Sequence, residues 1–415
     1  MNLRVAVLSV HTCPLAALGG KETGGMNVYV RESVRALGRM GVEVDVFTRS
    51  QDPGIRRIVP LGEGARVIHL PAGPQRPMPR EVVHQHLPEF VAGIEAFRES
   101  EDLAYDLIHA HYWLSGVAGL ELRERWDTPV VQMFHTLGRL KNRVARADNE
   151  REPELRIGEE TRIVSAVDRI VAANSVERAH LVWYYGASAE RIAVIPCGVD
   201  TELFQPMGAA TAKGLLDLPS APLLLYVGRL QPIKGLETLL EAMARLDRAT
   251  LLIVGGDQDE PENGHGEYLR GRVAALGLDA RVHFLGAQPQ ERLRLLYAAA
   301  DATVMPSYYE SFGMVALEAM ACGSPVVASR VGGLTTTVRD GVTGFLVPEG
   351  DAGALAARLA AVLADPRLRE RLGREATRWA AEHRWPCVAE QVCGLYAELR
   401  PAASQHLDRA RCTQR

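Results

Sequence analysis

Short runs of β-branched and other apolar residues alternate with longer helical stretches along almost the whole chain. The runs are RVAVLSV, VEVDVFT, RVIHL, DLIHAH, PVVQMF, RIVAAN and RIAVIP in the first half, and PLLLYVG, TLLIVGG, RVHFLG, ATVMPS, PVVAS and GFLVP in the second. This alternation is typical of parallel sheets covered by helices. The stretch from Gly25 shows the helical pattern, with Met26, Val30, Val34 and Leu37 on one face. The sequence therefore predicts an α/β fold.

The alternation pauses near residue 200 and then starts again. A length of 415 residues exceeds one ordinary core. We therefore predict two doubly wound, Rossmann-like domains, at 1–200 and 201–382, followed by an amphipathic helix at 383–400 and a frayed tail at 401–415. Ligands of open α/β sheets bind beyond the carboxyl ends of the strands, so two facing sheets predict a cleft lined by strand-to-helix loops.

Composition narrows the class of function. With 47% apolar and 24% charged residues the chain is ordinary for a globular protein, and a net charge of -4 provides no basic field for nucleic acid. The six cysteines show neither CxxC nor zinc spacing, which favours the reducing cytoplasm. No apolar run approaches the ~20 residues that cross a bilayer, and the first run is too short for a signal peptide. A peripheral membrane contact through an arginine-bearing helix stays open.

Glycines precede the first predicted helix in HTCPLAALGGKETGGMNVY, at positions 19, 20, 24 and 25. Such glycines let backbone amides approach an anion at the positive end of a helix. The spacing matches neither GxGxxG nor the P-loop pattern, so it supports neither a Rossmann cofactor site nor an NTPase. Phosphate contact and a flexible loop that ends in a helix cap both remain open.

Two cations meet a predicted helix start in VGRLQPIKGLETLL, at Arg229 and Lys234. Only four of the 47 basic residues are lysine, so a lysine at such a position indicates a need for a compact ammonium group. Fixed cations at this place would stabilise a diphosphate leaving group as it gains charge. The alternative is a surface pair that flanks a turn.

Two glutamates stand eight residues apart in PSYYESFGMVALEAMACG. Glu310 lies in the predicted loop, and Glu318 lies in the predicted helix, within a run that has the composition of a buried segment. The change from loop to helix lets the two carboxylates reach different parts of one extended ligand. A buried carboxylate needs a partner, and ligand hydroxyls are one such partner, whereas a solvated helix face is the alternative.

The first predicted domain contains polar residues after two strands, in HAHYWLSG and FHTLGRLKN. They are His109, His111, Tyr112, His135, Thr136, Lys141 and Asn142. The three histidines raise the question of a metal, but no acidic ligand or HxxxH spacing accompanies them, so we predict no metal site. Arg80 in MPRE and Arg156 in ELRIGEE are further candidate contacts for an anion, with an ordinary surface location as the alternative.

Together, GGMNVYV, GRLQPIKG and ESFGMVALEAMACG resemble the retaining family-4 glycosyltransferases with the GT-B fold, and the resemblance covers almost the whole chain. Its most specific element is the E-x7-E block combined with Arg229 and Lys234. Within the family, HAHYWLSG, HTLGRLKN and ELRIGEE are similar to the D-inositol 3-phosphate glycosyltransferases of mycothiol synthesis, with sucrose-phosphate synthases as near neighbours.

The resemblance implies transfer of a hexosyl group, N-acetylglucosamine or glucose, from a UDP-sugar to a small phosphorylated acceptor such as inositol 3-phosphate. No cofactor and no metal are implied, the C-terminal helix would return to the first domain, and a homodimer is one expected state. The implied catalytic residues are His135, Arg229, Lys234 and Glu310. The implied donor-binding residues are Gly25, Arg229, Lys234, Glu310, Phe312, Gly313, Met314 and Glu318. The implied acceptor-binding residues are Lys21, Asn27, Arg80, Tyr112, Thr136 and Arg156.

Some positions depart from the family pattern and keep other functions open. Arginine stands at position 80, where the relatives often carry lysine, which keeps the charge but changes the geometry. The segment HTLG partly resembles the corresponding segment of the sucrose-phosphate synthases. Transfer of glucose to fructose 6-phosphate is therefore an alternative. A metal-dependent glycosyltransferase is a rival because Asp257 and Asp259 form a DxD motif. A nucleotide-sugar epimerase, a phosphorylase and a non-catalytic nucleotide-sugar binding protein are the other rivals.

Overall fold

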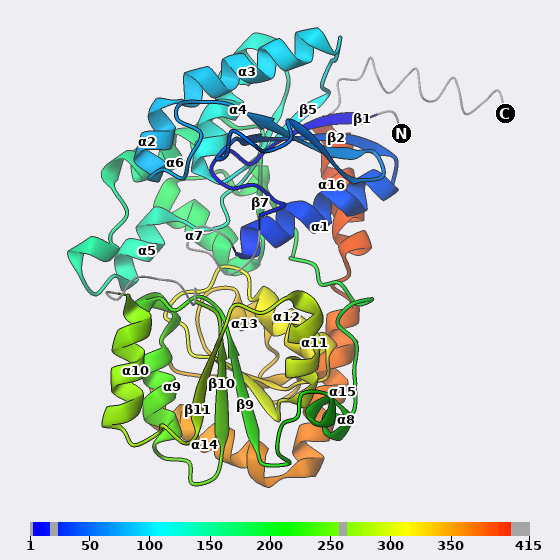
Figure 1. Cartoon of the computed structure of the whole chain (residues 1–415). Helices are drawn as coiled ribbons and strands as arrows, with labels where there is room; N and C mark the ends of the chain where they lie inside the picture. Colours follow the sequence, from blue (N-terminus) through cyan, green and yellow to red (C-terminus); the bar gives the residue numbers. More distant parts are fainter. Residues whose placement is uncertain (1–2, 17–23, 257–263, 400–415) are drawn as a thin grey trace, which may run out of the picture. The chain divides into compact units, whose positions relative to one another are not determined.

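The computed structural model describes residues 3–16, 24–256 and 264–399 of the chain (Figure 1). These residues form two compact units. Unit 1 comprises residues 3–16, 25–196 and 385–399, and unit 2 comprises Gly24 and residues 197–256 and 264–384. Each unit is built around its own sheet, and each is described by itself below.

Unit 1 contains an eight-stranded sheet with the strand order β3-β4-β2-β1-β5-β6-β7-β8. The strands are β1 (Leu3–Leu8), β2 (Val42–Arg49), β3 (Ile58–Gly62), β4 (Ala65–Leu70), β5 (Leu107–His111), β6 (Val130–Met133), β7 (Arg169–Ala172) and β8 (Ile192–Val194). All neighbours pair in parallel except β3 and β4, which pair antiparallel. The edge strand β3 was not among the predicted strands; its run is short, is interrupted by Pro60 and consists mostly of exposed residues.

Helices cover both faces of this sheet (Figure 1). They are α1 (Gly25–Arg39), α2 (Arg80–Gln85), α3 (Leu87–Ser100), α4 (Trp113–Trp126), α5 (Gly138–Val144), α6 (Glu154–Ala166), α7 (Ser175–Tyr185) and α16 (Trp385–Leu399). Helix α16 packs against α1, and its Tyr396 hydroxyl lies 2.6 Å from Nδ1 of His109 in β5. The expected return of the C-terminal helix to the first domain is therefore confirmed.

Unit 2 contains a six-stranded, fully parallel sheet with the order β11-β10-β9-β12-β13-β14. Its strands are β9 (Leu223–Val227), β10 (Thr250–Val254), β11 (Val282–Gly286), β12 (Ala302–Met305), β13 (Val326–Ser329) and β14 (Gly344–Val347). Its helices are α8 (Ala209–Leu215), α9 (Leu236–Met243), α10 (His265–Ala275), α11 (Gln290–Ala299), α12 (Met314–Ala321), α13 (Leu334–Thr337), α14 (Ala352–Ala364) and α15 (Pro366–Ala381). Buried aliphatic side chains from β9, β10, α9 and α14 form its core.

The region 352–380 reads as one helical stretch in the sequence but forms two helices. Asp365 ends α14 and caps α15, because its carboxylate accepts hydrogen bonds from the amides of Arg367 and Leu368 at 2.9 and 3.2 Å. Pro366 occupies the first position of α15, where the missing N–H costs nothing. The break is therefore a local capping effect.

Both sheets have the strand order of a doubly wound fold, which confirms the predicted α/β class. The chain leaves β1 toward β2 and later returns to pair β5 with β1, and it leaves β9 toward β10 and later returns to pair β12 with β9. Ligands of such sheets bind beyond the carboxyl ends of the strands at this switch in direction. The loops after β1 and β5 in unit 1, and after β9 and β12 in unit 2, are therefore the places to look for a site.

Within the described part of the chain, no helix has the length and apolarity that a membrane span requires.

Candidate functional site

In unit 2 the structure brings Lys234 and Glu310 together. Lys234 ends a short 3-10 turn (Pro232–Lys234) after β9, and Glu310 follows β12, the neighbouring strand. The Lys234 Nζ atom donates a hydrogen bond of 2.6 Å to Glu310 Oε2, and the two side chains are only 18% and 15% exposed. Two residues that lie 76 positions apart therefore form one charged pair because their strands are adjacent.

The Glu310 carboxylate is held in its ionised form. Burial opposes ionisation, but the charge and hydrogen bond of Lys234 and the amides of Gly313 and Phe312 outweigh it and lower the pKa of Glu310. The buried Tyr226 hydroxyl donates to the Arg229 carbonyl at 2.9 Å, and the charges of Arg229 and Glu310 both act on this tyrosine. Burial first, and then the charge of Glu310, raise the pKa of Tyr226, while the charge of Arg229 opposes them. This arrangement presents an ionised acceptor beside a cation.

Close backbone packing fixes the turn that carries Lys234. Gly235 has φ +67°, and a Cβ atom at this position would lie 2.1 Å from the carbonyl oxygen of Pro306. The amide of Tyr308 donates to the carbonyl of Ile233 at 2.9 Å, which ties the loop after β12 to the loop after β9. Only glycine fits here, so Gly235 sets the position of the lysine before it.

Glu318 lies on α12 and is half-buried, so the expectation of a fully buried carboxylate was too strong. It accepts a hydrogen bond of 2.8 Å from the Tyr297 hydroxyl of α11. Gly313 caps α12 in the left-handed conformation at φ 76°, Met314 begins that helix, and the Phe312 carbonyl accepts from Thr337. These residues shape the loop between the two glutamates.

In unit 1 the most buried charged residue at the predicted site is Arg156 of α6. It is 1% exposed, so the alternative that it is an ordinary surface residue is wrong. Its Nε donates to Glu160 Oε1 at 2.7 Å, its second guanidinium nitrogen donates to the carbonyl and hydroxyl of Thr136 at 2.8 and 3.0 Å, and its remaining nitrogen lies 2.9 Å from Glu152 Oε2. Each of the three guanidinium nitrogens therefore has a carboxylate, carbonyl or hydroxyl partner.

Tyr112 lies beside both predicted arginines. Its ring centroid is 5.6 Å from the Arg80 guanidinium and 4.9 Å from that of Arg156. Tyr112 follows β5 with φ 75°, and Thr136 follows β6, which pairs with β5. Adjacent strands thus bring these predicted residues together. The cluster also contains a carboxylate, Glu152, which forms ion pairs with Arg80 at 3.9 Å, with Lys141 and with Arg156.

Two further predicted residues of unit 1, Asn27 and Gly25, belong to α1. Asn27, buried in α1, donates to the Thr12 hydroxyl at 2.6 Å and to the Cys13 carbonyl at 2.7 Å. Gly25 is exposed and begins α1. Lys21 and the DxD motif of Asp257 and Asp259 lie outside the described residues.

His135 belongs to a buried group of aromatic and histidine side chains. Its Nε2 lies 2.9 Å from Nδ1 of His111, and the ring of Tyr29 meets it edge-on at 5.4 Å. Burial first, and then the charge of His109, lower the pKa of His135 to about 3. The imidazole is therefore neutral at physiological pH. Among the described residues, no group of three or more histidines, cysteines, aspartates or glutamates is arranged to hold a metal ion.

Sequence reasoning missed the carboxylates that surround Arg156. Glu152, Arg156 and Glu160 are spaced four residues apart, which is the spacing of ion pairs along a helix and would have indicated them. It also named Lys141 without assigning it to the acceptor group. Lys213, by contrast, has a structural part in unit 2, since its ammonium bonds the Ala221 carbonyl and Asp301.

Two doubly wound units with charged groups at their strand-end loops have the architecture of the nucleotide-sugar-dependent glycosyltransferases. Family models agree with this class: the one described as Glycosyltransferase Family 4 matches residues 23–203, and the one described as Glycosyl transferases group 1 matches residues 216–379. The chain belongs to the family-4 glycosyltransferases with the GT-B fold, and its activity is that of a glycosyltransferase.

Individual relatives support this assignment. The D-inositol 3-phosphate glycosyltransferase of Acidothermus cellulolyticus is 42% identical over 97% of this chain and 93% of its own length. The structure of the sucrose-phosphate synthase from Thermosynechococcus elongatus matches with a TM-score of 0.90 and 39% identity, covering 96% of this chain and 99% of that one. Anabaena HepE, solved in complex with UDP and glucose, matches with a TM-score of 0.76 at 22% identity over 96% of this chain and all of its own, which shows the shared fold.

Proposed function

We propose that the protein transfers a hexosyl group, N-acetylglucosamine or glucose, from a UDP-sugar to a small phosphorylated acceptor such as inositol 3-phosphate. One observation carries the proposal: Arg80 of α2, Lys141 of α5 and Arg156 of α6 converge on a single carboxylate, Glu152, in the segment between α5 and α6. Three cations around one oxyanion position suit a phosphoryl group.

In this proposal unit 2 binds the donor. Arg229 and Lys234 hold the diphosphate and stabilise the charge that grows on it as the glycosidic bond breaks. Glu310, ionised beside Lys234, accepts hydrogen bonds from hydroxyls of the transferred sugar. Glu318 contacts the ribose. The remaining proposed donor contacts are Phe312, Gly313 and Met314 of the same unit and Gly25 at the start of α1 in unit 1.

Unit 1 binds the acceptor in the same proposal. Arg80 and Arg156, together with Tyr112 and Thr136, surround the acceptor phosphate, and the proposed contacts to the rest of the acceptor are Lys21 and Asn27. His135 lies beside the transferred sugar. Because its imidazole is neutral, it exchanges hydrogen bonds with sugar hydroxyls without adding a charge that would compete for the phosphate.

The proposed chemistry retains the anomeric configuration without a protein nucleophile. The acceptor oxygen forms a bond to the anomeric carbon on the face from which the diphosphate leaves, and the bond from that carbon to the phosphate oxygen breaks. The acceptor proton passes to the departing diphosphate. The protein contributes positioning and electrostatic stabilisation, and no divalent metal is required.

The relatives support a phosphorylated acceptor, and their names suggest two candidate acceptors. The curated relative is named for D-inositol 3-phosphate, and the sucrose-phosphate synthase matches at nearly the same identity. Transfer of glucose to fructose 6-phosphate is therefore the second candidate function.

A matrix of donors and acceptors tests both candidates. UDP-N-acetylglucosamine, UDP-glucose and GDP-mannose are each offered with inositol 3-phosphate, fructose 6-phosphate and 3-phosphoglycerate, and product is detected by mass spectrometry. We expect turnover with one UDP-sugar and with inositol 3-phosphate. Turnover with fructose 6-phosphate alone supports the second candidate, and absence of turnover with all three phosphorylated acceptors contradicts the proposal.

Two controls separate the rival functions. UDP-sugar incubated without acceptor should remain unchanged, whereas an epimerase would convert it. Full activity in EDTA is expected, and loss of activity that Mg²⁺ or Mn²⁺ restores would contradict the metal-independent mechanism.

A further inference from the structure

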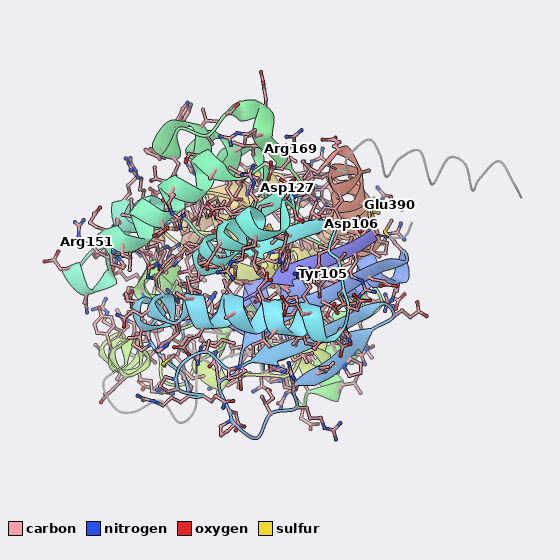
Figure 2. The ribbon with its side chains drawn as sticks, turned by 90° about the horizontal axis from the view of Figure 1, so that it is seen from above. Tyr105, Asp106, Asp127, Arg151, Arg169 and Glu390 are labelled. Carbon is pink, nitrogen blue, oxygen red and sulfur yellow. The ribbon has the colours of Figure 1, made fainter. Side chains whose placement is uncertain are left out.

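Glu152 receives cations from three different helices. Its Oε1 atom pairs with Lys141 of α5 and lies 3.9 Å from Arg80 of α2, while its Oε2 lies 2.9 Å from Arg156 of α6. The side chain is only 9% exposed. The residue before it, Arg151, is exposed and points away from the protein (Figure 2). Within this short connection, the carboxylate therefore turns inward while its neighbour stays in solvent.

The backbone at Glu152 is anchored independently of its carboxylate. Its amide donates to the side-chain oxygen of Asn142 at 2.6 Å, and the Asn142 amide group donates to the Glu152 carbonyl at 3.1 Å. Burial opposes ionisation, but the charges of Arg156 and Lys141 outweigh it and lower the pKa of Glu152 to about 2. A tethered, permanently ionised carboxylate thus sits among the three cations.

The second carboxylate on Arg156 has a different position. Glu160 is 0% exposed and also accepts hydrogen bonds from the Gly138 amide at 2.9 Å and the Tyr185 hydroxyl at 2.5 Å. Glu160 is therefore part of the buried packing between α5, α6 and α7. Glu152, by contrast, contacts the cations only through its carboxylate. The guanidinium groups of Arg80 and Arg156 and the ammonium group of Lys141 that it pairs with are the groups that would bind a phosphoryl group.

We infer that Glu152 is a built-in competitor that occupies the phosphoryl position of the empty acceptor site and determines which anions can enter it. The inference rests on the proposed function, because it assumes that the acceptor phosphate binds at this cluster. A tethered carboxylate competes at a high effective concentration. A monoanion offers the cations no more than Glu152 already does, whereas a phosphoryl dianion with three oxygens displaces it. Glu152 thereby selects phosphorylated acceptors over carboxylated ones.

Glu152→Gln tests the inference because it removes the charge and keeps the shape and the Asn142 anchor. Glu154→Gln is the matched control, since Glu154 is exposed at the start of α6, two residues after Glu152, and the change in net charge is identical. Calorimetry at pH 8 on the full chain uses inorganic phosphate and acetate as probes. We expect the Kd for phosphate to fall on the order of tenfold in Glu152→Gln, with acetate binding measurable in that variant alone. Glu154→Gln should behave as wild type.

Equal or weaker phosphate binding by Glu152→Gln would overturn the inference, since the carboxylate would then organise the cations rather than compete for them. Absence of phosphate binding in every variant would overturn it as well. If Glu152→Gln does not fold, Glu152→Ser serves the same comparison. Turnover of phosphorylated acceptors is measured in parallel. Normal wild-type turnover with unchanged phosphate affinity refutes the Glu152 inference alone, whereas tightened phosphate binding with no turnover on any phosphorylated acceptor refutes the proposed function.

Discussion

Replacement of Arg156 by methionine separates the structural role of this residue from its proposed role in acceptor binding. Methionine has similar length but removes the ion pairs to Glu152 and Glu160 and both hydrogen bonds to Thr136. Glu152 keeps Lys141 and Arg80 as partners. Glu160, at 0% exposure, loses the cation of its ion pair, and the partners that it keeps among the described residues are the Gly138 amide and the Tyr185 hydroxyl.

The size of the effect follows from the buried charge that remains. Removal of one partner of a buried ion pair typically costs about 3–5 kcal/mol, because the other charge stays desolvated and uncompensated. Against a total stability of roughly 5–15 kcal/mol, this is a large loss. Glu160→Gln in the Arg156→Met background removes the stranded charge, and we expect it to restore at least ~2 kcal/mol.

Urea unfolding followed by circular dichroism measures the stability, and initial rates with the acceptor found in the donor and acceptor matrix measure function. We expect Arg156→Met to be destabilised, the double variant to be mostly restored, and both to lose at least about 30-fold in kcat/KM for the phosphorylated acceptor. Recovery of kcat/KM together with stability would show that Arg156 acts only through packing. A single variant as stable as wild type would refute the argument about Glu160.

The other predictions concern the donor pair, one glycine and one buried acid. Lys234→Ala and Glu310→Gln should each lower kcat by on the order of 100-fold with an unchanged circular dichroism spectrum, and near-normal rates in either would remove the pair from the proposed site. Gly235→Ala should lower the free energy of unfolding by roughly 1–3 kcal/mol, because the new Cβ meets the Pro306 carbonyl at positive φ; an unchanged Tm would contradict this. Burial raises the pKa of Glu177 from 4.5 to about 7. Between these two pH values the folded protein binds a proton that the unfolded chain has released, so the free energy of unfolding should fall by about 3 kcal/mol as the pH rises from 4.5 to 7. Glu177→Gln should flatten this dependence in thermal melts across that range, and an equally steep profile in the variant would assign the effect to another group.

The strands and their order of appearance were accessible from the sequence because buried parallel strands are short, apolar and β-branched, and because helices separate them. The edge strand β3 was not, since Pro60 interrupts its short apolar run and proline is atypical of a strand interior. The division of residues 352–380 into two helices depends on Asp365, which caps the second helix, and on Pro366, which begins it. The sequence analysis missed this break because the whole stretch has a helical composition.

The site residues show the same difference between what local sequence indicates and what long-range contacts decide. Arg229, Lys234, Glu310 and Glu318 stand out in the sequence because lysine is scarce in this chain, because Glu318 interrupts an apolar helical run, and because the spacing of the four residues resembles a family pattern. Which of them meet is decided by strand order: β9 pairs with β12, and this adjacency brings Lys234 to Glu310. Glu318 instead meets Tyr297, a partner that no local pattern could indicate.

By itself, then, the sequence determined two doubly wound sheets, the loops that end their strands and the kinds of charge in those loops, because periodicity and composition are local properties. Only the tertiary structure decided that Arg156 is buried, that Glu152 faces three cations and that His135 is neutral. Burial and ion pairing depend on contacts between segments far apart in the chain, and the energy of a charge is set by those neighbours rather than by the residue's own type.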